Sequence, residues 1–291
     1  MFEILKCFVK SFSDSRYFYH CFTGLFTSNN SRIFLRKLEN FILFSKFKNL
    51  DSQGHLSESG LIVLPSLIST STISAITNFL HDKPISTVGK NSVTFSNSQT
   101  SFPSNINVAY FDPIDLVKCK EIFEIASHPT IHSHLEDFFG DIPYQLDYIG
   151  AWRSFASAKD TRDQQFFHRD IDTLQSIKVF CYLTDVDLSS GPHVFIPYSQ
   201  HSTVFRNKGS KFCDRDVSKY FPFPTHVTLT GPSGSVFIED TFALHKGIKP
   251  TDSDRLLLQF IFSVHRTPFL NPKFLSSDFS PKNSSIFKNF F

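Results

Sequence analysis

Three residues of this chain have the types and spacing of metal ligands: His168, Asp170 and His245. His168 and Asp170 are two positions apart, and side chains at i and i+2 of a β-strand leave the same face, so this imidazole and carboxylate can converge on one ion. His245 comes much later, in an apolar, strand-like context. Two imidazoles and one carboxylate leave coordination positions open for a cosubstrate and dioxygen, as in non-heme iron(II) oxygenases. Zinc can be held in the same way.

A His-X-Asp sequence alone is weak support for a metal site, because chance matches are common. Arg255 strengthens it, since it follows His245 by ten residues and begins the apolar run LLLQFIFSV. An arginine that enters a buried strand needs an anion, because an unpaired buried guanidinium is very costly. Its planar fork suits a carboxylate held by two parallel hydrogen bonds. The pattern therefore indicates a metal ion and an acidic ligand in one site.

These segments resemble the phytanoyl-CoA dioxygenase family of iron(II)- and 2-oxoglutarate-dependent oxygenases, in which a His-X-Asp, a distal His and an Arg about ten residues later recur in this order. GPHVFIPYSQH resembles the family stretch Asn-Gly-Pro-Leu-x-x-x-Pro-Gly-Ser-His, and GPSGSVFIEDTFALHKG resembles Gly-Asp-x-x-x-Phe...Leu-His-Gly. The resemblance covers roughly residues 60–265. Tyr198 stands where the family usually has the Gly of Pro-Gly-Ser-His, and Lys246 stands where a small residue is frequent.

The resemblance implies a mainly β fold with flanking α-helices: a double-stranded β-helix core (jelly roll, cupin-like) with N-terminal helices. It implies that His168, Asp170 and His245 bind Fe(II), and that Arg255 pairs with the far carboxylate of the cosubstrate 2-oxoglutarate. In the family, an aromatic residue at about the place of Tyr182 contacts 2-oxoglutarate. Halogenases of this superfamily have a small residue in place of the carboxylate, so Asp170 favours hydroxylation over halogenation.

Residues 176–185 alternate as a strand whose two faces differ in polarity. We expect the apolar face to pack between the sheets, and it comprises Ile177, Val179, Cys181 and Leu183. We expect the other face to line the barrel interior with the iron, and it comprises Lys178, Phe180, Tyr182 and Thr184. Lys178 is then either a second cation for an acidic ligand such as 2-oxoglutarate or a lysine whose ammonium reaches solvent at the rim.

Other histidines are weaker candidates. Either His193 or His201 can face substrate, although the family pattern gives His201 a mainly structural place, and neither is included among the metal ligands. We interpret His128, His132 and His134 as surface or capping residues, since no carboxylate lies in register with them.

The 291 residues divide into an N-terminal helical extension (1–58), the jelly-roll domain (59–266) and a peripheral C-terminal tail (267–291). In the extension, RIFLRKLENFILFSKF predicts an amphipathic helix with basic residues opposite an apolar face. That face comprises Ile33, Phe34, Leu38, Phe41, Ile42 and Phe44. This helix either packs on the domain or contacts a membrane surface or a partner.

Local signals predict the remaining elements. A strand at residues 60–64 precedes a helix capped by Ser69 or Thr70 and running to about Leu80. Two further helices are expected at 113–126 and 129–139, the second ended by Gly140. A strand at 144–155 feeds the ligand strand. Residues 206–224 form a charged insertion.

Composition narrows the class of protein. The net charge of +2 gives no case for nucleic-acid binding. Five scattered cysteines without a C-x-x-C pair are typical of reduced thiols. No apolar run has the length of a membrane span or the form of a signal peptide, so we expect a cytoplasmic protein.

Three functions fit these observations. The first, which we favour, is a dioxygenase that hydroxylates a small-molecule C–H bond with release of succinate and CO2. The second is a non-catalytic metal-binding jelly-roll module. The third is a hydroxylase of a protein or other macromolecule. The sequence does not identify the substrate. The segments that would surround it, 91–111, 153–165 and 206–224, are those whose structure the sequence patterns predict least well.

Overall fold

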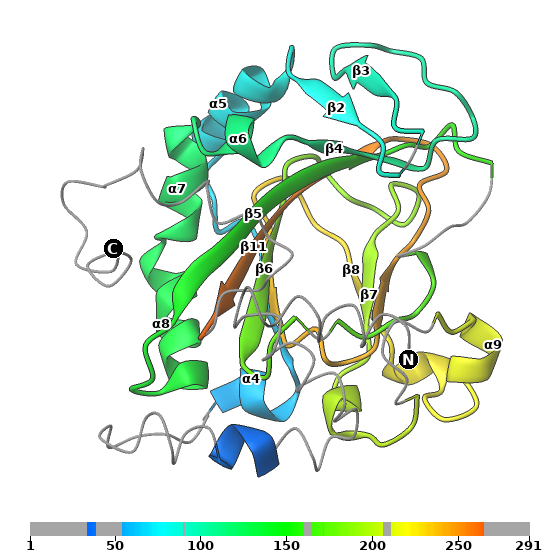
Figure 1. Ribbon diagram of the computed structural model, residues 1–291. Helices are drawn as coiled ribbons and strands as arrows, with labels where there is room; N and C mark the ends of the chain where they lie inside the picture. Colours follow the sequence, from blue (N-terminus) through cyan, green and yellow to red (C-terminus); the bar gives the residue numbers. More distant parts are fainter. Residues whose placement is uncertain are drawn as a thin grey trace, which may run out of the picture.

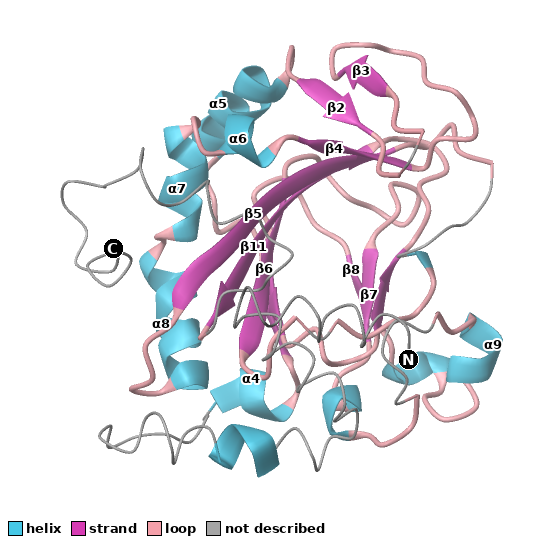
Figure 2. Cartoon of the chain, viewed as in Figure 1, coloured by secondary structure: helices cyan, strands magenta, loops and turns pink. Residues whose placement is uncertain are grey.

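The computed structural model describes residues 34–38, 54–89, 91–159, 165–170, 172–205 and 211–264. In these residues two antiparallel sheets face each other, and helices cover the outer face of the larger sheet (Figures 1 and 2). This architecture confirms the predicted mainly β jelly roll with flanking helices. The boundaries at residues 59 and 266 remain predictions.

Over the described ranges, the larger sheet contains eight strands and the smaller sheet three. The larger sheet has the order β1 (Leu61–Leu64), β9 (Val236–Glu239), β6 (Ser176–Tyr182), β11 (Arg255–Ser263), β5 (Gln145–Ser154), β4 (Val108–Phe111), β2 (Pro84–Ser86), β3 (Thr94–Ser96). The smaller sheet has the order β10 (His245–Gly247), β7 (His193–Phe195), β8 (Val227–Leu229). The chain crosses between sheets from β9 to β10 and back again to β11. His245 and Arg255 therefore lie on opposite walls of the interior.

The two faces of β6 pack against different partners. Ile177, Val179 and Cys181 are fully buried in a core cluster that also contains residues of α5 (Thr70–Leu80), α7 (Lys120–Ala126) and α8 (Pro129–Phe139). The prediction that this face packs between the sheets is wrong, because the helices cover the outer side of the larger sheet. The opposite face, with Phe180 and Tyr182, packs between the sheets instead.

Helix ends follow local chemistry. Ser69 caps α5, as predicted, by accepting a hydrogen bond from the Thr72 amide. Gly140 ends α8 at a positive φ of 62°, a conformation that glycine adopts easily. The single helix predicted at residues 113–126 is wrong: α6 (Pro113–Leu116) and α7 are separate, because Cys119 has extended backbone angles. A short helix, α4 (Gly54–Glu58), precedes β1.

The three histidines around α8 do not share one role. His128 caps α8, accepting a hydrogen bond from the Thr130 amide, as predicted. His132 is buried, not on the surface, and its ring nitrogens pair with the Tyr144 hydroxyl and the Ala126 carbonyl. Burial lowers the pKa of His132. This histidine is part of the core and does not form a metal site with His128.

A helical turn at residues 34–38 packs on the domain. Leu35 is buried there, whereas Phe34 and Leu38, predicted on the packing face, are exposed. Arg36 donates hydrogen bonds to the Phe138 carbonyl and to Gln175 Oε1. The rest of the predicted amphipathic helix, and the tail at 267–291, lie outside the described residues. Contact of this helix with a membrane remains a prediction, and within the described part no helix is long and apolar enough to cross one.

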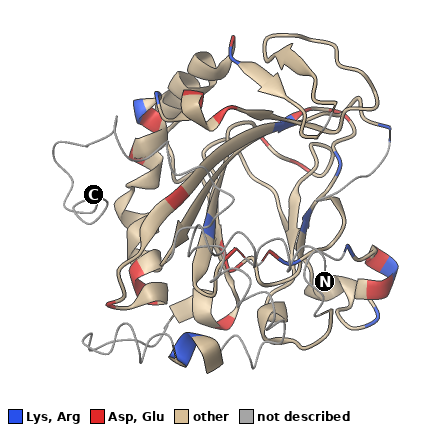
Figure 3. Cartoon of the chain, in the orientation of Figure 1, with Lys and Arg blue, Asp and Glu red and all other residues tan. Residues whose placement is uncertain are grey.

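Charged side chains and cysteines are scattered over the described residues. In the described part of the chain, Lys and Arg are interspersed with Asp and Glu, and no basic stripe is visible in this view (Figure 3). Cys119, Cys181 and Cys213 are free thiols, and Cys7 and Cys21 lie outside the described residues.

Candidate active site

Backbone hydrogen bonds link the His-X-Asp segment to the chain between the end of β9 and the start of β10. His168 and His245 form an isolated antiparallel bridge, with amide-to-carbonyl distances of 3.0 and 3.1 Å. The Asp170 amide donates to the Thr241 carbonyl at 2.8 Å. The expectation of a regular ligand strand is therefore only partly met, since one bridge replaces a continuous ladder. That bridge is sufficient to bring two residues far apart in the sequence onto one site.

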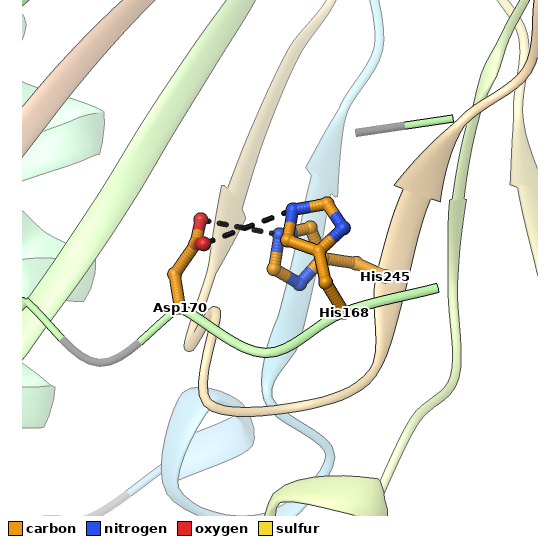
Figure 4. A group of neighbouring side chains, drawn as sticks. All are labelled: His168, Asp170 and His245. Carbon is orange, nitrogen blue, oxygen red and sulfur yellow. Dashed lines mark ion pairs between the residues drawn. The ribbon is translucent and has the colours of Figure 1, made fainter. Parts of the chain in front are cut away.

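The three predicted metal ligands converge (Figure 4). Nε2 of His168 lies 3.7 Å from Oδ1 of Asp170, and Nε2 of His245 lies 3.3 Å from Oδ2. One ligand atom from each residue lies within 4.8 Å of the others. Two imidazole nitrogens and one carboxylate oxygen at this separation fit a facial triad for iron(II).

Backbone carbonyls fix the orientation of both imidazole rings. Nδ1 of His168 donates to the Phe166 carbonyl, and Nδ1 of His245 donates to the Ala243 carbonyl, each at 2.9 Å. A carbonyl oxygen only accepts, so the proton of each neutral ring is on Nδ1 and the lone pair is on Nε2. A hydrogen bond from the second ring nitrogen to a fixed acceptor orients a metal-binding histidine in this way. Burial, and then His245, lower the pKa of His168 to about 4.

Lys178 is the counter-ion of the triad carboxylate. Its ammonium lies 2.7 Å from Oδ2 of Asp170 and 3.0 Å from Oδ2 of Asp172. Burial raises the pKa of Asp170, but Lys178 and the two imidazoles outweigh burial and hold it well below its usual range. With its side chain 7% exposed, Lys178 does not reach solvent at the rim, so that alternative is wrong. Contact between Lys178 and 2-oxoglutarate remains a prediction.

Arg255 lies buried on the opposite wall without a carboxylate partner among the described residues. Its Nη1 donates to the Gly191 carbonyl, its Nη2 lies 3.4 Å from Oγ of Ser154, and its Nε has no partner. A Cβ atom at Gly247 would lie 3.0 Å from Nη2, so glycine leaves room for the guanidinium. Burial lowers the pKa of Arg255. An anionic ligand would supply the missing partner, which fits a dicarboxylate.

Tyr182 does not line the cavity. Its hydroxyl donates to the Leu229 carbonyl at 2.8 Å and accepts from the His193 amide at 3.1 Å. Burial raises its pKa to about 12. The predicted contact between Tyr182 and 2-oxoglutarate has no support in this geometry, because the hydroxyl is already paired with the smaller sheet. Phe180, two residues earlier on the same face of β6, lines the cavity instead.

One cavity of about 310 Å³ connects these groups. Its walls include all three triad residues, Arg255 and Lys178. Four aromatic side chains form a further wall of the cavity, and only Phe180 among them was expected to face the interior from the sequence; the wall comprises Tyr110, Tyr148, Trp152 and Phe180. The inward alternation of β4, β5 and β6 is the only sequence signal for these residues, and it does not show which of them reach the site. His201, by contrast, pairs with the carbonyls of Ser57 and Glu58, consistent with a structural role.

A jelly roll whose interior holds a His-X-Asp and a distal His, beside a buried arginine, defines the class of iron(II)- and 2-oxoglutarate-dependent oxygenases. A sequence model of the phytanoyl-CoA dioxygenase (PhyH) family matches residues 56–251, more than half of the chain. The chain belongs to this family, and it is an enzyme of the dioxygenase type.

The similar solved structures are distant in sequence. The epimerase SnoN in complex with Fe3+, alpha ketoglutarate and nogalamycin RO is 16% identical, covering 79% of this chain and 89% of its own, with a TM-score of 0.52. HygX from Streptomyces hygroscopicus, with nickel and 2-oxoglutarate bound, is also 16% identical, covering 74% of this chain and 85% of its own, with a TM-score of 0.48. No curated protein matches the sequence. At such identities, similarity to SnoN shows the fold alone.

Proposed function

We propose that this protein hydroxylates a C–H bond of a small molecule, consuming dioxygen and 2-oxoglutarate and releasing succinate and CO2. One observation carries the proposal: a single cavity is lined both by the His-Asp-His triad and by a buried guanidinium that has no carboxylate partner in the described part of the chain. The triad can bind a metal ion, and the guanidinium can bind the carboxylate of an acidic ligand. A purely structural metal site would need the triad but not the guanidinium.

In this proposal His168, Asp170 and His245 hold the iron. Bound iron(II) supplies a site where dioxygen reduction is coupled to oxidative decarboxylation of 2-oxoglutarate. The backbone carbonyls of Phe166 and Ala243 keep both Nε2 lone pairs directed at the ion. Asp170 contributes the one negative charge of the ligand set.

Arg255 binds the far carboxylate of 2-oxoglutarate. The guanidinium is fixed by the Gly191 carbonyl, so its orientation is set before the ligand arrives. A buried, preoriented cation loses little side-chain entropy on binding, which favours affinity. The surrounding buried wall excludes water and strengthens the charge pair.

A small molecule is favoured over a macromolecule by the form of the site. The cavity volume of about 310 Å³ lies within the range of small-ligand sites. The aromatic wall of Tyr110, Tyr148, Trp152 and Phe180 offers an apolar surface within the cavity that the triad also lines. We therefore expect a substrate with an apolar or planar portion that can stack on this wall.

The proposal is tested by reconstitution. Purified protein is mixed with Fe(II), 2-oxoglutarate and dioxygen, and succinate is measured with and without a metabolite extract. We expect His168→Ala and Asp170→Ala to abolish iron binding and succinate formation. Arg255→Ala should retain iron and chiefly raise the concentration of 2-oxoglutarate required.

The matched control is a surface His–Asp pair. The His81 and Asp82 side chains are 66% and 86% exposed. The double variant His81→Ala/Asp82→Ala removes the same residue types and should bind iron and form succinate like wild type. Full iron occupancy in Asp170→Ala, or absence of succinate from iron-loaded wild type, would contradict the proposal.

A further inference from the structure

Several polar side chains that line the cavity are paired within the protein. Lys178 is paired with two carboxylates. His193, one of the histidines considered as able to face substrate, lines the cavity and has its Nε2 3.0 Å from Oε2 of Glu239. In the proposed function the metal ion occupies the triad and 2-oxoglutarate occupies Arg255. The side-chain amide of Gln259 differs from these groups, because it lines the same cavity and has no hydrogen-bond partner in the described part of the chain.

Gln259 lies in the middle of an apolar floor formed by the larger sheet. It belongs to the inward face of β11, between Leu257 and Ile261, which also line the cavity. In the ladders it lies opposite Phe180 of β6 and opposite Gly150 of β5. The residue is only 9% exposed. A buried amide without a partner costs free energy, so this amide in the cavity wall indicates a ligand that supplies the missing hydrogen bonds.

Gly150 leaves the space beside Gln259 to the Tyr148 ring. A Cβ atom at Gly150 would lie 2.5 Å from Cε1 of Tyr148 and 2.7 Å from its hydroxyl oxygen, so any larger residue would displace this ring. Tyr148 therefore lies along β5 over the glycine, with its hydroxyl at the strand position that neighbours Gln259. This hydroxyl also has no hydrogen-bond partner among the described residues. An aromatic ring and two unpaired polar groups thus meet at one place in the cavity.

The position of Gln259 along β11 separates it from the cosubstrate. It is four residues from Arg255, and at about 3.3 Å per residue their Cα atoms are roughly 13 Å apart, which exceeds the length of a five-carbon dicarboxylate. Ile261, the next inward residue, lies opposite Lys178, whose ammonium is bound to Asp170. The amide is therefore on the triad side of the cavity, where the C–H bond to be hydroxylated must lie.

The chemistry of the amide defines the group that would pair with it. A glutamine side chain presents a carbonyl acceptor beside an N–H donor, and a ligand with a donor beside an acceptor satisfies both at once. Lactams and carboxamides have this pattern. The residues that flank Gln259 in the sheet are uncharged, so an ionised ligand group would be buried there without a counter-ion. The Tyr148 ring favours a flat partner.

We propose that Gln259 binds the substrate, and that the substrate is an uncharged, flat molecule whose lactam or carboxamide group pairs with this side chain beside the Tyr148 ring. This inference rests on the proposed function, because it names the substrate class of the same site. It makes Gln259 a specificity-determining residue that belongs neither to the metal ligands nor to the cosubstrate site, and it explains the glycine at position 150.

The test uses a probe with this chemistry, 2-quinolinone, which is a flat bicyclic lactam. Protein loaded with Mn(II) and 2-oxoglutarate, without iron, is titrated with the probe, and the affinity is obtained from the paramagnetic broadening of the probe's proton signals. The comparison probe is 2-methylquinoline, which has the same flat shape but lacks the carbonyl and the N–H. We expect wild type to bind 2-quinolinone about tenfold more tightly or better, because two hydrogen bonds are gained.

The variant Gln259→Leu removes the amide and keeps a side chain of similar size. Its affinity for 2-quinolinone should fall about tenfold or more, whereas its affinity for 2-methylquinoline should stay within about threefold of wild type. Its affinity for 2-oxoglutarate, measured by calorimetry on Mn(II)-loaded protein, should stay within about twofold. The melting temperature of the ligand-free variant should rise by about 2–4 °C, because an unpaired buried amide is removed, whereas loss of a structural residue would lower it. Gln99→Leu, at an exposed glutamine, is the matched control and should bind both probes like wild type.

Equal affinity of wild type and Gln259→Leu for 2-quinolinone would overturn the inference and leave the proposed function intact. Failure of wild type to bind this probe at millimolar concentration would do the same. A loss of about tenfold in 2-oxoglutarate affinity in Gln259→Leu would also overturn the inference, since the residue would then bind the cosubstrate. Failure of Mn(II)-loaded wild type to bind 2-oxoglutarate would overturn both proposals.

Discussion

Replacing Lys178 by methionine should strengthen metal binding while weakening the metal-free fold. The ammonium lies 2.7 Å from Oδ2 of Asp170, so in the metal-free protein it neutralises the carboxylate that a metal ion also needs. A divalent metal ion bound to Asp170 is repelled by the positively charged Lys178 ammonium, which is paired with the same carboxylate. Methionine has a similar length and no charge, so Lys178→Met removes this repulsion with little change in packing.

The size of the effect follows from charge and distance. A metal–carboxylate oxygen bond is about 2.1 Å long, so an ion on either oxygen of Asp170 lies within roughly 7 Å of the ammonium. At an effective dielectric constant of 20, the repulsion between that ion and one unit charge is about 5 kcal/mol. Relaxation and the nearby Asp172 reduce it, and we expect a net gain of about 1.4–3 kcal/mol, which is roughly tenfold to a hundredfold in affinity. The metal-free fold should lose about 3 kcal/mol, because two partly buried carboxylates, 30% and 29% exposed, lose their cation.

Chelator competition with Mn(II) measures the metal affinity, and urea unfolding measures the free energy of unfolding of the metal-free protein. Lys178→Arg is the control, because it keeps the charge and should bind Mn(II) within about threefold of wild type. Weaker Mn(II) binding in Lys178→Met would refute the counter-ion role. A tenfold loss of 2-oxoglutarate affinity at equal metal loading would instead assign Lys178 to the cosubstrate.

Three other perturbations test the surroundings of the site. Tyr198 has a left-handed φ of 65° and an exposed side chain, so Tyr198→Gly should raise stability by about 1 kcal/mol and the melting temperature by about 2–4 °C, whereas Tyr198→Ala should not. Burial raises the pKa of Glu239 to about 8, so the protonated carboxyl stabilises the metal-free protein below about pH 4.5, and this contribution is lost as the pH rises through 8. The free energy of unfolding, measured with urea across this pH range, should therefore fall by about a few kcal/mol less in Glu239→Gln than in wild type. Arg169 donates to the carbonyls of Phe242 and Ser199, so Arg169→Leu should lower both the unfolding free energy, by roughly 3 kcal/mol, and the Mn(II) affinity.

The metal ligands and Arg255 were accessible from sequence because each leaves a local signal. His168 and Asp170 have the spacing of one strand face, and the structure brings them together although only one bridge forms. Arg255 is a cation at the head of a long apolar run, and β11 is indeed buried throughout. Tyr198 stands where the family has glycine, and its positive φ gives the physical reason for glycine at that turn.

Alternation assigns a residue to one face of a strand but not to a depth along the strand. Period-two alternation correctly placed Phe180 and Tyr182 on the inward face of β6, but it does not show which of the two lies beside the cavity. That depends on the register of β6 against β9 and β11, which is set by contacts far away in the sequence. Lys178 illustrates the same limit, because its partners Asp170 and Asp172 lie in a loop and not on a paired strand.

Glu239 was missed for a stronger reason. A carboxylate at the end of the apolar strand β9 is indistinguishable in sequence from a strand-terminal surface residue, and its partner His193 is 46 positions away on the other sheet. Only the packing of the two sheets makes this a pair. The same packing sets the distance between His245 on the smaller sheet and Arg255 on the larger sheet. A ligand that reaches from one to the other must therefore fit the spacing of the two sheets, which the His193–Glu239 hydrogen bond also bridges. A substitution that alters the spacing of the sheets, such as one that leaves a cavity at Phe237 between them, should therefore lower the affinity for the cosubstrate more than the affinity for the metal. The reason is that the triad residues meet at the single His168–His245 bridge, whereas Arg255 lies on the opposite wall.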